Sequence, residues 1–395
     1  MPGPLAGIRI VDLSIALSGP WAVALLADQG AEVVKVEPPG IGDIGRWVGV
    51  RVNGIGAMFQ MANRGKRSIA LDLRQESARE IVRALARRAD VFVQNFRPGV
   101  VARLGLDEET LRADHPELIY VSISGFGESG PYAEKSAYDP VVQAYGGLAA
   151  TQTDARSGDP QLLQQTAADK ITALTAAQAI SAALFARERG RGGQHLRLSM
   201  LDAVVSFVWA DAAGNEVLRD ADGSQPSSFS QGQRLFRYRD GWGIAAPVSD
   251  ADFAGMCRAF GVDGWDDPRV ATIGERIKHR ALVTEIMERV HAAAARLDTA
   301  EATRRMEAEG TPCGVVLRTD QLPDDPHVRA VGLLEESRHP VAGRLRQPRH
   351  PTDFAATPAR VGSGAPTLGQ HANEILRELG LGERIAELRA SGAVV

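Results

Sequence analysis

The start of the chain alternates between strand and helix patterns, and this alternation constrains the fold more than any other feature of the sequence. The apolar run Ile8–Leu13 predicts a strand, Gly19 and Pro20 open a helix, and residues 31–37 predict a second strand. Two strands that a helix connects in this way lie parallel in one sheet. Later strand and helix patterns alternate at 69–73, 76–88, 91–94 and 118–123. The sequence therefore predicts an α/β fold.

This pattern is also typical of nicotinamide-dependent dehydrogenases. Glu37 ends the second strand, where an acid that binds ribose would lie. The turn after the first strand, residues 14–20, lacks the Gly-x-Gly-x-x-Gly motif of those enzymes. Without the glycines a pyrophosphate cannot approach the backbone closely, so the missing motif argues against a dehydrogenase.

An alanine-rich helix is predicted in the middle of the chain, and Asp169 lies where it begins. Apolar and small residues recur at spacings of three and four from Ile171 to Phe185, and the glycines at 190, 192 and 193 end the pattern. Asp169 has two interpretations. It is a helix N-cap, for which Asp is a preferred residue, or it is a carboxylate nucleophile that the helix N-terminus keeps ionised. Periodicity does not choose between them.

Five cations lie around predicted loops at strand ends. Singly, each is best interpreted as a solvated surface residue, because most Arg and Lys side chains are exposed. Together they suit a ligand that carries several phosphates, since Arg forks match phosphate oxygens well. The five are Arg64, Lys66, Arg67, Arg97 and Arg103.

Ordered motifs along nearly the whole chain are similar to those of one family. Ala168-Asp169-Lys170 is followed by Arg187-x-x-Gly-Arg-Gly-Gly-Gln and then by Ser199–Ala203. Asn63–Ser68 and Asn95–Gly99 lie upstream. Through these motifs the chain resembles the family III CoA-transferases. That family includes formyl-CoA:oxalate and carnitine CoA-transferases, and also the 2-methylacyl-CoA racemases.

The resemblance implies a Rossmann-like large domain built from both ends of the chain, with a small α+β domain inserted between them. The expected boundaries are 1–215 for the first part of the large domain, 216–322 for a linker and the small domain, and 323–395 for a return linker and the rest of the large domain. The resemblance also implies an interlocked homodimer.

The sequence of the inserted stretch supports its α+β character. Residues 235–245 predict a hairpin that turns at Asp240-Gly241. Helices are expected at 252–260, 276–297 and 299–309.

The resemblance further implies which residues act. Asp169 would be the catalytic nucleophile, which takes an acyl group from an acyl-CoA donor, and a carboxylic acid would be the acceptor. Coenzyme A would be bound as a substrate, with no metal and no tightly bound cofactor. The residues expected to contact coenzyme A are Leu17, Ser18, Leu71, Asp72, Leu73, Arg74, Asn95, Phe96, Arg97, Arg103, Ala137, Tyr138 and Asp139.

Two chemistries occur in this family, and the residues before Asp139 distinguish them. A racemase needs an acid and a base on opposite faces of the acyl α-carbon, and the racemases that resemble this chain supply one from a Gly-His-Asp. This chain has Ala137-Tyr138-Asp139 there, and a tyrosine with a reference pKa of about 10 is a poor proton shuttle near neutral pH. His195 alternates with apolar residues and is interpreted as structural. We therefore expect a CoA-transferase, with a 2-methylacyl-CoA racemase or a catalytically silent CoA-binding homologue as alternatives.

Two positions depart from patterns in the family. Family transferases can carry an arginine directly after the acid that ends the second strand, where this chain has Pro38. Some relatives cover the reacting carboxyl groups with a run of glycines, where this chain has Gln231-Gly232-Gln233. With its single glycine in that segment, the chain is not expected to be a formyl-CoA:oxalate enzyme.

Composition limits the partners and the compartment. A net charge of -4 gives no reason to expect nucleic acid or an anionic membrane as a partner. The two cysteines, Cys257 and Cys313, form no disulfide framework, and the first residues do not resemble a signal peptide. The alanine-rich helix is too short and too polar to span a bilayer. We therefore expect a cytoplasmic protein that binds neither nucleic acid nor membrane.

Overall fold

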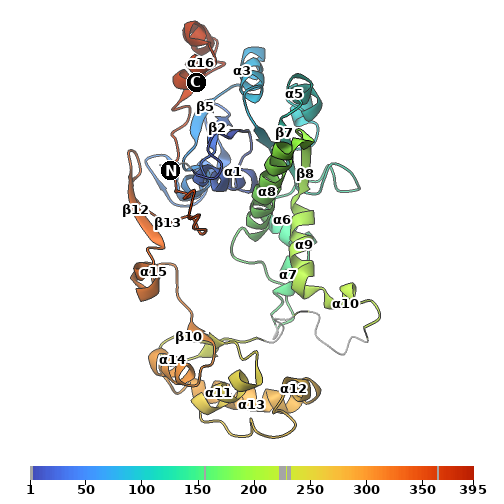
Figure 1. Cartoon of the computed structure of the whole chain (residues 1–395), viewed down its shortest axis with the longest axis vertical. Helices are drawn as coiled ribbons and strands as arrows, with labels where there is room; N and C mark the ends of the chain where they lie inside the picture. The colour runs from blue at the N-terminus through green and yellow to red at the C-terminus, as the bar shows by residue number, and fades with distance from the viewer. Residues whose placement is uncertain (1–2, 155–156, 222–227, 229–232, 363) are drawn as a thin grey trace. The chain divides into compact units, whose positions relative to one another are not determined.

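The computed structural model describes residues 3–154, 157–221, 228, 233–362 and 364–395 (Figure 1). The chain divides into two compact units. The larger unit combines residues 1–228 with 332–395, and the smaller unit comprises residues 229–331. Both ends of the chain thus belong to the same unit. None of the helices in the described residues has the length and apolar character needed to cross a membrane.

The larger unit is built on a six-stranded sheet in which every neighbouring pair is parallel, and this confirms the predicted α/β fold. The strand order is β5-β2-β1-β6-β7-β8, so β1 has β2 on one side and β6 on the other. In open α/β sheets, ligands bind outside the carboxyl ends of the strands where the order reverses in this way. The strands are β1 Arg9–Asp12, β2 Glu32–Glu37, β5 Arg67–Ala70, β6 Val91–Gln94, β7 Ile119–Ser124 and β8 His195–Ser199.

Helices cover both faces of this sheet (Figure 1). On one face α8 (Ala167–Ala186) packs between α1 (Ser18–Asp28) and α9 (Met200–Ala212). Small buried side chains of α8, such as Ala173 and Ala176, let its neighbours approach closely. The opposite face is covered by α3 (Glu76–Ala86), α5 (Glu108–Asp114), α16 (Ala372–Glu378) and α17 (Ile385–Ala390).

The end of the chain extends the edge of the sheet at β5. Val394 forms a β-bridge with Leu71, which follows β5 directly, and the Val395 N–H donates to the carbonyl oxygen of Ala70. The His371 N–H donates to the carbonyl oxygen of Ser68 within the same strand. These backbone bonds attach the C-terminal segment to the N-terminal half of the unit.

The larger unit also contains elements outside the main sheet and its covering helices, and the sequence pattern did not predict most of them because the helices among them span only three to seven residues. Two antiparallel pairs, β3 with β4 and β12 with β13, lie outside the main sheet. The short elements are η1 Ile44–Trp47, β3 Arg51–Val52, β4 Ile55–Gly56, α2 Ala57–Asn63, α4 Val100–Arg103, α6 Asp139–Tyr145, α7 Leu148–Thr151, η2 Arg187–Arg191, α10 Gly214–Val217, β12 Leu334–His339, β13 Gly343–Pro348 and η4 Gly382–Arg384.

The smaller unit contains a three-stranded antiparallel sheet and several helices. The predicted hairpin is confirmed, because β9 pairs with β10 and the Tyr238 N–H donates to the Gly241 carbonyl oxygen. The predicted single helix 276–297 is wrong, because the backbone of His279 leaves the helical region and divides this stretch into α12 and α13. The elements are β9 Phe236–Arg237, β10 Trp242–Ala245, α11 Asp250–Ala259, α12 Ile273–Lys278, α13 Arg280–Ala294, α14 Thr299–Ala308, β11 Cys313–Val315, η3 Leu322–Asp324 and α15 Pro326–Ala330.

Buried ion pairs join the carboxyl ends of β1 and β2 to the segment before β5. Lys35 Nζ lies 2.8 Å from Asp43 Oδ2 and 3.8 Å from Asp12 Oδ2. Lys66 Nζ lies 2.7 Å from Asp12 Oδ2, and all four side chains are buried. Burial by itself raises the pKa of Asp12, but Lys35 and Lys66 bring this pKa below its ordinary value. We call these four residues the buried ion cluster.

We expect Asp12→Ala to lower the free energy of unfolding by about 3–5 kcal/mol, because the substitution leaves two buried lysines without their shared partner. Chemical unfolding followed by circular dichroism measures this change. Asp114→Ala is the control, since Asp114 pairs with Arg87 at the surface, where such pairs contribute about 0–1 kcal/mol. A loss for Asp12→Ala no larger than that of the control would contradict the structural role of the cluster.

Candidate active site

A pocket of about 530 Å³ lies at the carboxyl ends of β1, β6 and β7, and Asp169 is part of its wall. The loop after β1 supplies Ile15 and Ser18, the loop after β6 supplies Asn95–Pro98, and the end of β7 supplies Ser124. This is the edge of the sheet where the strand order reverses between β1 and β6. The pocket therefore occupies the position at which this class of sheet binds ligands.

Asp169 is the third residue of α8 and does not cap its own helix. Thr166 occupies the N-cap position, and its side chain makes no capping hydrogen bond. The backbone N–H of Asp169 instead donates to Asp139 Oδ2 at 2.9 Å. The N-cap interpretation of Asp169 is therefore wrong, and its carboxylate is left available to the pocket.

The surroundings of Asp169 shift the equilibrium between its two protonation states. Burial raises the pKa of this carboxyl, the negative charge of Asp139 raises it further, and together they bring it to about 7. Interactions with the hydroxyl and the backbone N–H of Ser18 partly offset this rise. The pKa of Asp169 therefore lies much closer to neutral pH than that of an ordinary Asp.

A second pocket of about 580 Å³ adjoins the first, since both are lined by Ile15, Ile44 and Phe96. It extends along the ends of β2 and β5 and is largely apolar, with Pro38 and Pro39 on one side. Together the two pockets give an elongated site that is polar around Asp169 and apolar at its other end.

The structure brings most of the expected ligand contacts to these two pockets. The Asp169 pocket is lined by Ser18, Asn95, Phe96, Arg97, Ala137 and Tyr138. The adjoining pocket is lined by Leu71, Asp72, Leu73, Arg74 and again Phe96.

Three expected contacts line neither pocket. Leu17 is buried in the core, and Arg103 is exposed on α4. Asp139 is buried, and its carboxylate accepts hydrogen bonds from Asp169 and Gln143. Asn95 does line the Asp169 pocket, but both ends of its amide bind the backbone of Ile15 at 2.8 Å.

Three of the five cations that suit phosphates are engaged elsewhere, so that part of the prediction is wrong. Arg64 is buried and pairs with Asp28 at 2.6 Å. Lys66 belongs to the buried ion cluster. Arg67, the first residue of β5, pairs with Glu374 and Glu378. The side chains of Arg64, Lys66 and Arg67 thus stabilise the fold. Of the remaining two cations, Arg97 lines the Asp169 pocket.

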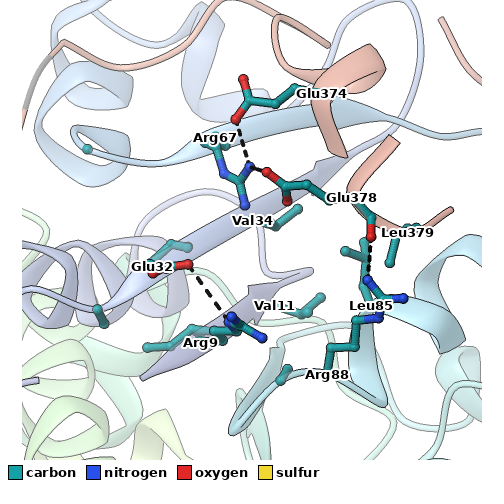
Figure 2. Close-up of a pocket in the computed structure, with 15 residues that line it drawn as sticks. Arg9, Val11, Glu32, Val34, Arg67, Leu85, Arg88, Glu374, Glu378 and Leu379 are labelled. Carbon is teal, nitrogen blue, oxygen red and sulfur yellow. Dashed lines mark hydrogen bonds and ion pairs between the residues drawn. The ribbon is translucent and has the colours of Figure 1, made fainter. Parts of the chain in front are cut away.

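Figure 2 shows a further pocket of about 660 Å³, which lies beside the first residues of β1, β2 and β5. Five of its six charged side chains are paired with one another: Arg67 with Glu374 at 2.8 Å and with Glu378 at 2.6 Å, and Arg9 with Glu32 at 3.9 Å. The sixth, Arg88, donates to the backbone carbonyl oxygen of Glu378. This pocket contains neither Asp169 nor any other residue expected to react. We therefore assign the chemistry to the carboxyl edge of the sheet.

Several pocket residues were not predicted. Ala16, Ile44, Lys135 and Met200 all line the Asp169 pocket. Ala16 adopts a left-handed conformation, with φ of 65°, which is unfavourable for any residue other than glycine. In the sequence, only the position of Ala16 in the turn after the first strand could have indicated that it lines the pocket. Gln231 and Gly232, from the expected covering loop, lie outside the described residues.

No cluster of three or more His, Cys, Asp and Glu side chains in the described part of the chain is arranged to hold a metal ion. His195 lines a different pocket, and its Nε2 lies 2.8 Å from Ser122 Oγ.

Comparisons with known proteins agree over nearly the whole chain. The family model described as CoA-transferase family III matches residues 5–372. A succinate–glutarate CoA-transferase from Agrobacterium fabrum is 34% identical, with 97% of each chain covered. A formyl-CoA:oxalate CoA-transferase from Rhodopseudomonas palustris is 32% identical, with 100% of this chain and 98% of the relative covered.

Solved structures show the same likeness. A CAIB/BAIF family protein from Brucella suis is 31% identical with a TM-score of 0.81, and the match covers 96% of this chain and 100% of that one. The protein Rv3272 from Mycobacterium tuberculosis is 29% identical with a TM-score of 0.79, and the match covers 94% and 98%.

We expect Asp169→Asn to raise the melting temperature, and to raise it more at pH 8 than at pH 5. The folded-state pKa of Asp169 lies above its unfolded value, so keeping this carboxyl ionised costs stability as the pH rises toward about 7. The cost is fully present above that pH and smaller below it. Differential scanning calorimetry at the two pH values measures the effect. Equal shifts at both values would show that the carboxyl is not destabilised by its surroundings.

Proposed function

The chain belongs to CoA-transferase family III, and from this membership we propose that it moves coenzyme A from an acyl-CoA donor to a carboxylic acid, with Asp169 as the nucleophile. The observation that carries the proposal is the Asp169 carboxylate, which lies in a pocket at the carboxyl edge of the sheet and is not used as a helix cap. A carboxylate with a pKa of about 7 is a better nucleophile than an ordinary Asp and is still substantially ionised near neutral pH.

The proposed cycle begins when an oxygen of Asp169 attacks the carbonyl carbon of the donor thioester. The C–S bond breaks, CoA leaves as a thiolate, and the acyl group remains as a mixed anhydride with Asp169. The thiolate then attacks the Asp169 carbonyl carbon, which releases the donor acid and forms an aspartyl-CoA thioester. The acceptor carboxylate attacks this thioester, and the same two steps in reverse give the new acyl-CoA and free Asp169.

Two helix N-termini stabilise the negative charge in these steps. α8 begins two residues before Asp169, and α1 begins at Ser18, whose hydroxyl and N–H both act on the Asp169 carboxyl. Backbone N–H groups at a helix start stabilise a developing oxyanion in the same way that they stabilise a carboxylate. We assign this role to the start of α1.

The adjoining apolar pocket suits the nucleotide end of coenzyme A. Pro38 and Pro39 offer flat apolar contacts, and the Arg74 side chain is 87% exposed at the rim. Arg97 lines the Asp169 pocket, nearer the reacting end. No tightly bound cofactor is required for this cycle, since CoA is a substrate. The relatives are named for small dicarboxylates, so succinate and glutarate are the first acceptors to try, and oxalate tests the expectation that this chain is not a formyl-CoA:oxalate enzyme.

The geometry does not favour a racemase. Of the residues that line the Asp169 pocket none is a histidine. Tyr138 is 71% exposed, and the Asp139 carboxylate is engaged by Asp169 and Gln143. The lining of the pocket therefore offers no His–Asp pair of the kind found in the racemases that resemble this chain. A catalytically silent homologue remains an outcome of the test below.

We also propose that the protein is a homodimer, interlocked as the family resemblance implies, and that it acts in the cytoplasm. Large apolar side chains are exposed on two neighbouring helices: Leu174 (55%) and Phe185 (67%) on α8, and Phe207 (56%) and Trp209 (47%) on α9. An apolar surface of this kind is typical of a protein–protein contact. The free thiols of Cys257 and Cys313 suit a reducing compartment.

We expect Asp169→Ala to lower the rate of CoA exchange between carboxylic acids by at least about 10³-fold, because no other group supplies the nucleophile. A panel of acyl-CoA donors and carboxylic acids measures the rate. Incubating the parent protein with its acyl-CoA and hydroxylamine should produce a hydroxamate at residue 169, which mass spectrometry detects. Exchange of the α-proton in D2O without this adduct would indicate a racemase, and neither signal would indicate a silent homologue.

We expect Phe185→Glu to convert the dimer to a monomer, because it places a charge in an apolar contact. Light scattering after size-exclusion chromatography measures the mass. Glu188→Gln, on the polar turn that follows, is the control and should stay dimeric. A parent protein that is monomeric at micromolar concentration would refute the dimer.

A further inference from the structure

Asp139 is a buried carboxylate that supplies the missing cap of α8. It is only 4% exposed, and it lies at the start of α6, about 30 residues before the nucleophile in the sequence. Its Oδ2 accepts the backbone N–H of Asp169 at 2.9 Å. Because Thr166 offers no capping bond, Asp139 is the side chain that satisfies this N–H in the first turn.

Gln143 ties the same carboxylate to the segment that leads into α8. Its Nε2 donates to Asp139 Oδ1 at 2.6 Å and to the carbonyl oxygen of Gln165 at 3.1 Å. Its Oε1 accepts the N–H of Leu163 at 3.0 Å, and its side chain is buried. One line of hydrogen bonds therefore runs from the approach segment through Gln143 and Asp139 to the backbone of Asp169.

We infer that Asp139 is a positioning residue for the proposed transferase reaction: it fixes the backbone of Asp169 and thereby aims the nucleophilic carboxylate into the pocket. This inference rests on the proposed function. Asp139 does not line the Asp169 pocket, so it acts through Asp169 and does not touch the substrate. The reacting carboxylate is one side chain away from the bonded N–H, and a displacement of about 1 Å at such a site can cost about 100-fold in rate.

The charge of Asp139 has a second consequence that can be measured. Its negative charge opposes ionisation of the Asp169 carboxyl. The other groups that face Asp169 are Ser18 from α1 and, within the same pocket, Arg97, Lys135 and Tyr138. Only an ionised Asp169 attacks a thioester, so the acid limb of kcat against pH reports its ionisation.

The test compares Asp139→Ala and Asp139→Asn with the parent. Asp139→Ala removes the acceptor, and we expect kcat to fall by about 100-fold while KM for acyl-CoA changes by less than about threefold. Asp139→Asn keeps an oxygen acceptor, and we expect it to recover at least about tenfold of that loss. Since Asn carries no charge, the acid limb of kcat against pH should lie about 1 pH unit lower in Asp139→Asn than in the parent. Asp114→Asn, at the surface, is the matched control and should change neither quantity.

The outcomes separate this inference from the proposed function. If Asp169→Ala is inactive but Asp139→Ala keeps kcat within about threefold of the parent, Asp139 does not position the nucleophile, and the transferase function still stands. If Asp169→Ala retains exchange, the proposed function itself fails. If circular dichroism shows that Asp139→Ala does not fold, Asp139→Asn decides alone. An acid limb at the parent position then overturns the inference, because an Asp139 carboxylate bonded to the Asp169 N–H must oppose ionisation of Asp169.

Discussion

The buried ion cluster is the interaction on which the site depends. Lys35 donates to the carbonyl oxygen of Ser14, and Asp43 accepts the N–H of Ala16 at 2.8 Å. Asn95 binds the backbone of Ile15 from the other side. These bonds hold the turn after β1 in a conformation that is strained at Ala16, and strain of this kind persists only where the surroundings over-determine it. The turn ends at Ser18, which acts on the carboxyl of Asp169, the proposed nucleophile.

The packing of α1 against α8 places the turn after β1 next to Asp169 in the candidate active site. Both helices pack on the same face of the sheet, and the alanines of α8 allow close contact. Each helix points its N-terminus at the carboxyl edge, so the partial positive charges of two helix ends converge on Asp169. Burial and Asp139 oppose this stabilisation, and the balance leaves a carboxyl with a pKa of about 7. The site thus contains a carboxyl group whose ionised form is not strongly stabilised, which suits the nucleophilic role that we propose for Asp169.

The motifs of this chain mix residues that support the fold with residues that line the site. Arg64 and Lys66 stand next to each other in a motif that the family resemblance associates with coenzyme A, but both side chains turn inward and pair with buried acids. Asp139 is a further example. It belongs to the segment 137–139, which was expected to contact coenzyme A, but its carboxylate accepts the backbone N–H of Asp169 in the first turn of α8. Charge pattern in a sequence cannot separate these roles, because it does not show on which side of the backbone a cation finds its partner.

The sequence by itself determined the parallel sheet, its central alanine-rich helix and the identity of the candidate nucleophile. Strand and helix periodicity are local properties, and each unit of strand, helix and strand admits one parallel arrangement. Most of the residues expected around the ligand also reached the two adjoining pockets, because loops at the carboxyl ends of parallel strands meet at one edge. Only the tertiary structure decided which acid caps α8, which cations are buried and how far Asp169 is desolvated. These properties depend on contacts between residues far apart in the sequence, such as Asp139 with Asp169 and Arg64 with Asp28, and no local pattern encodes such a contact.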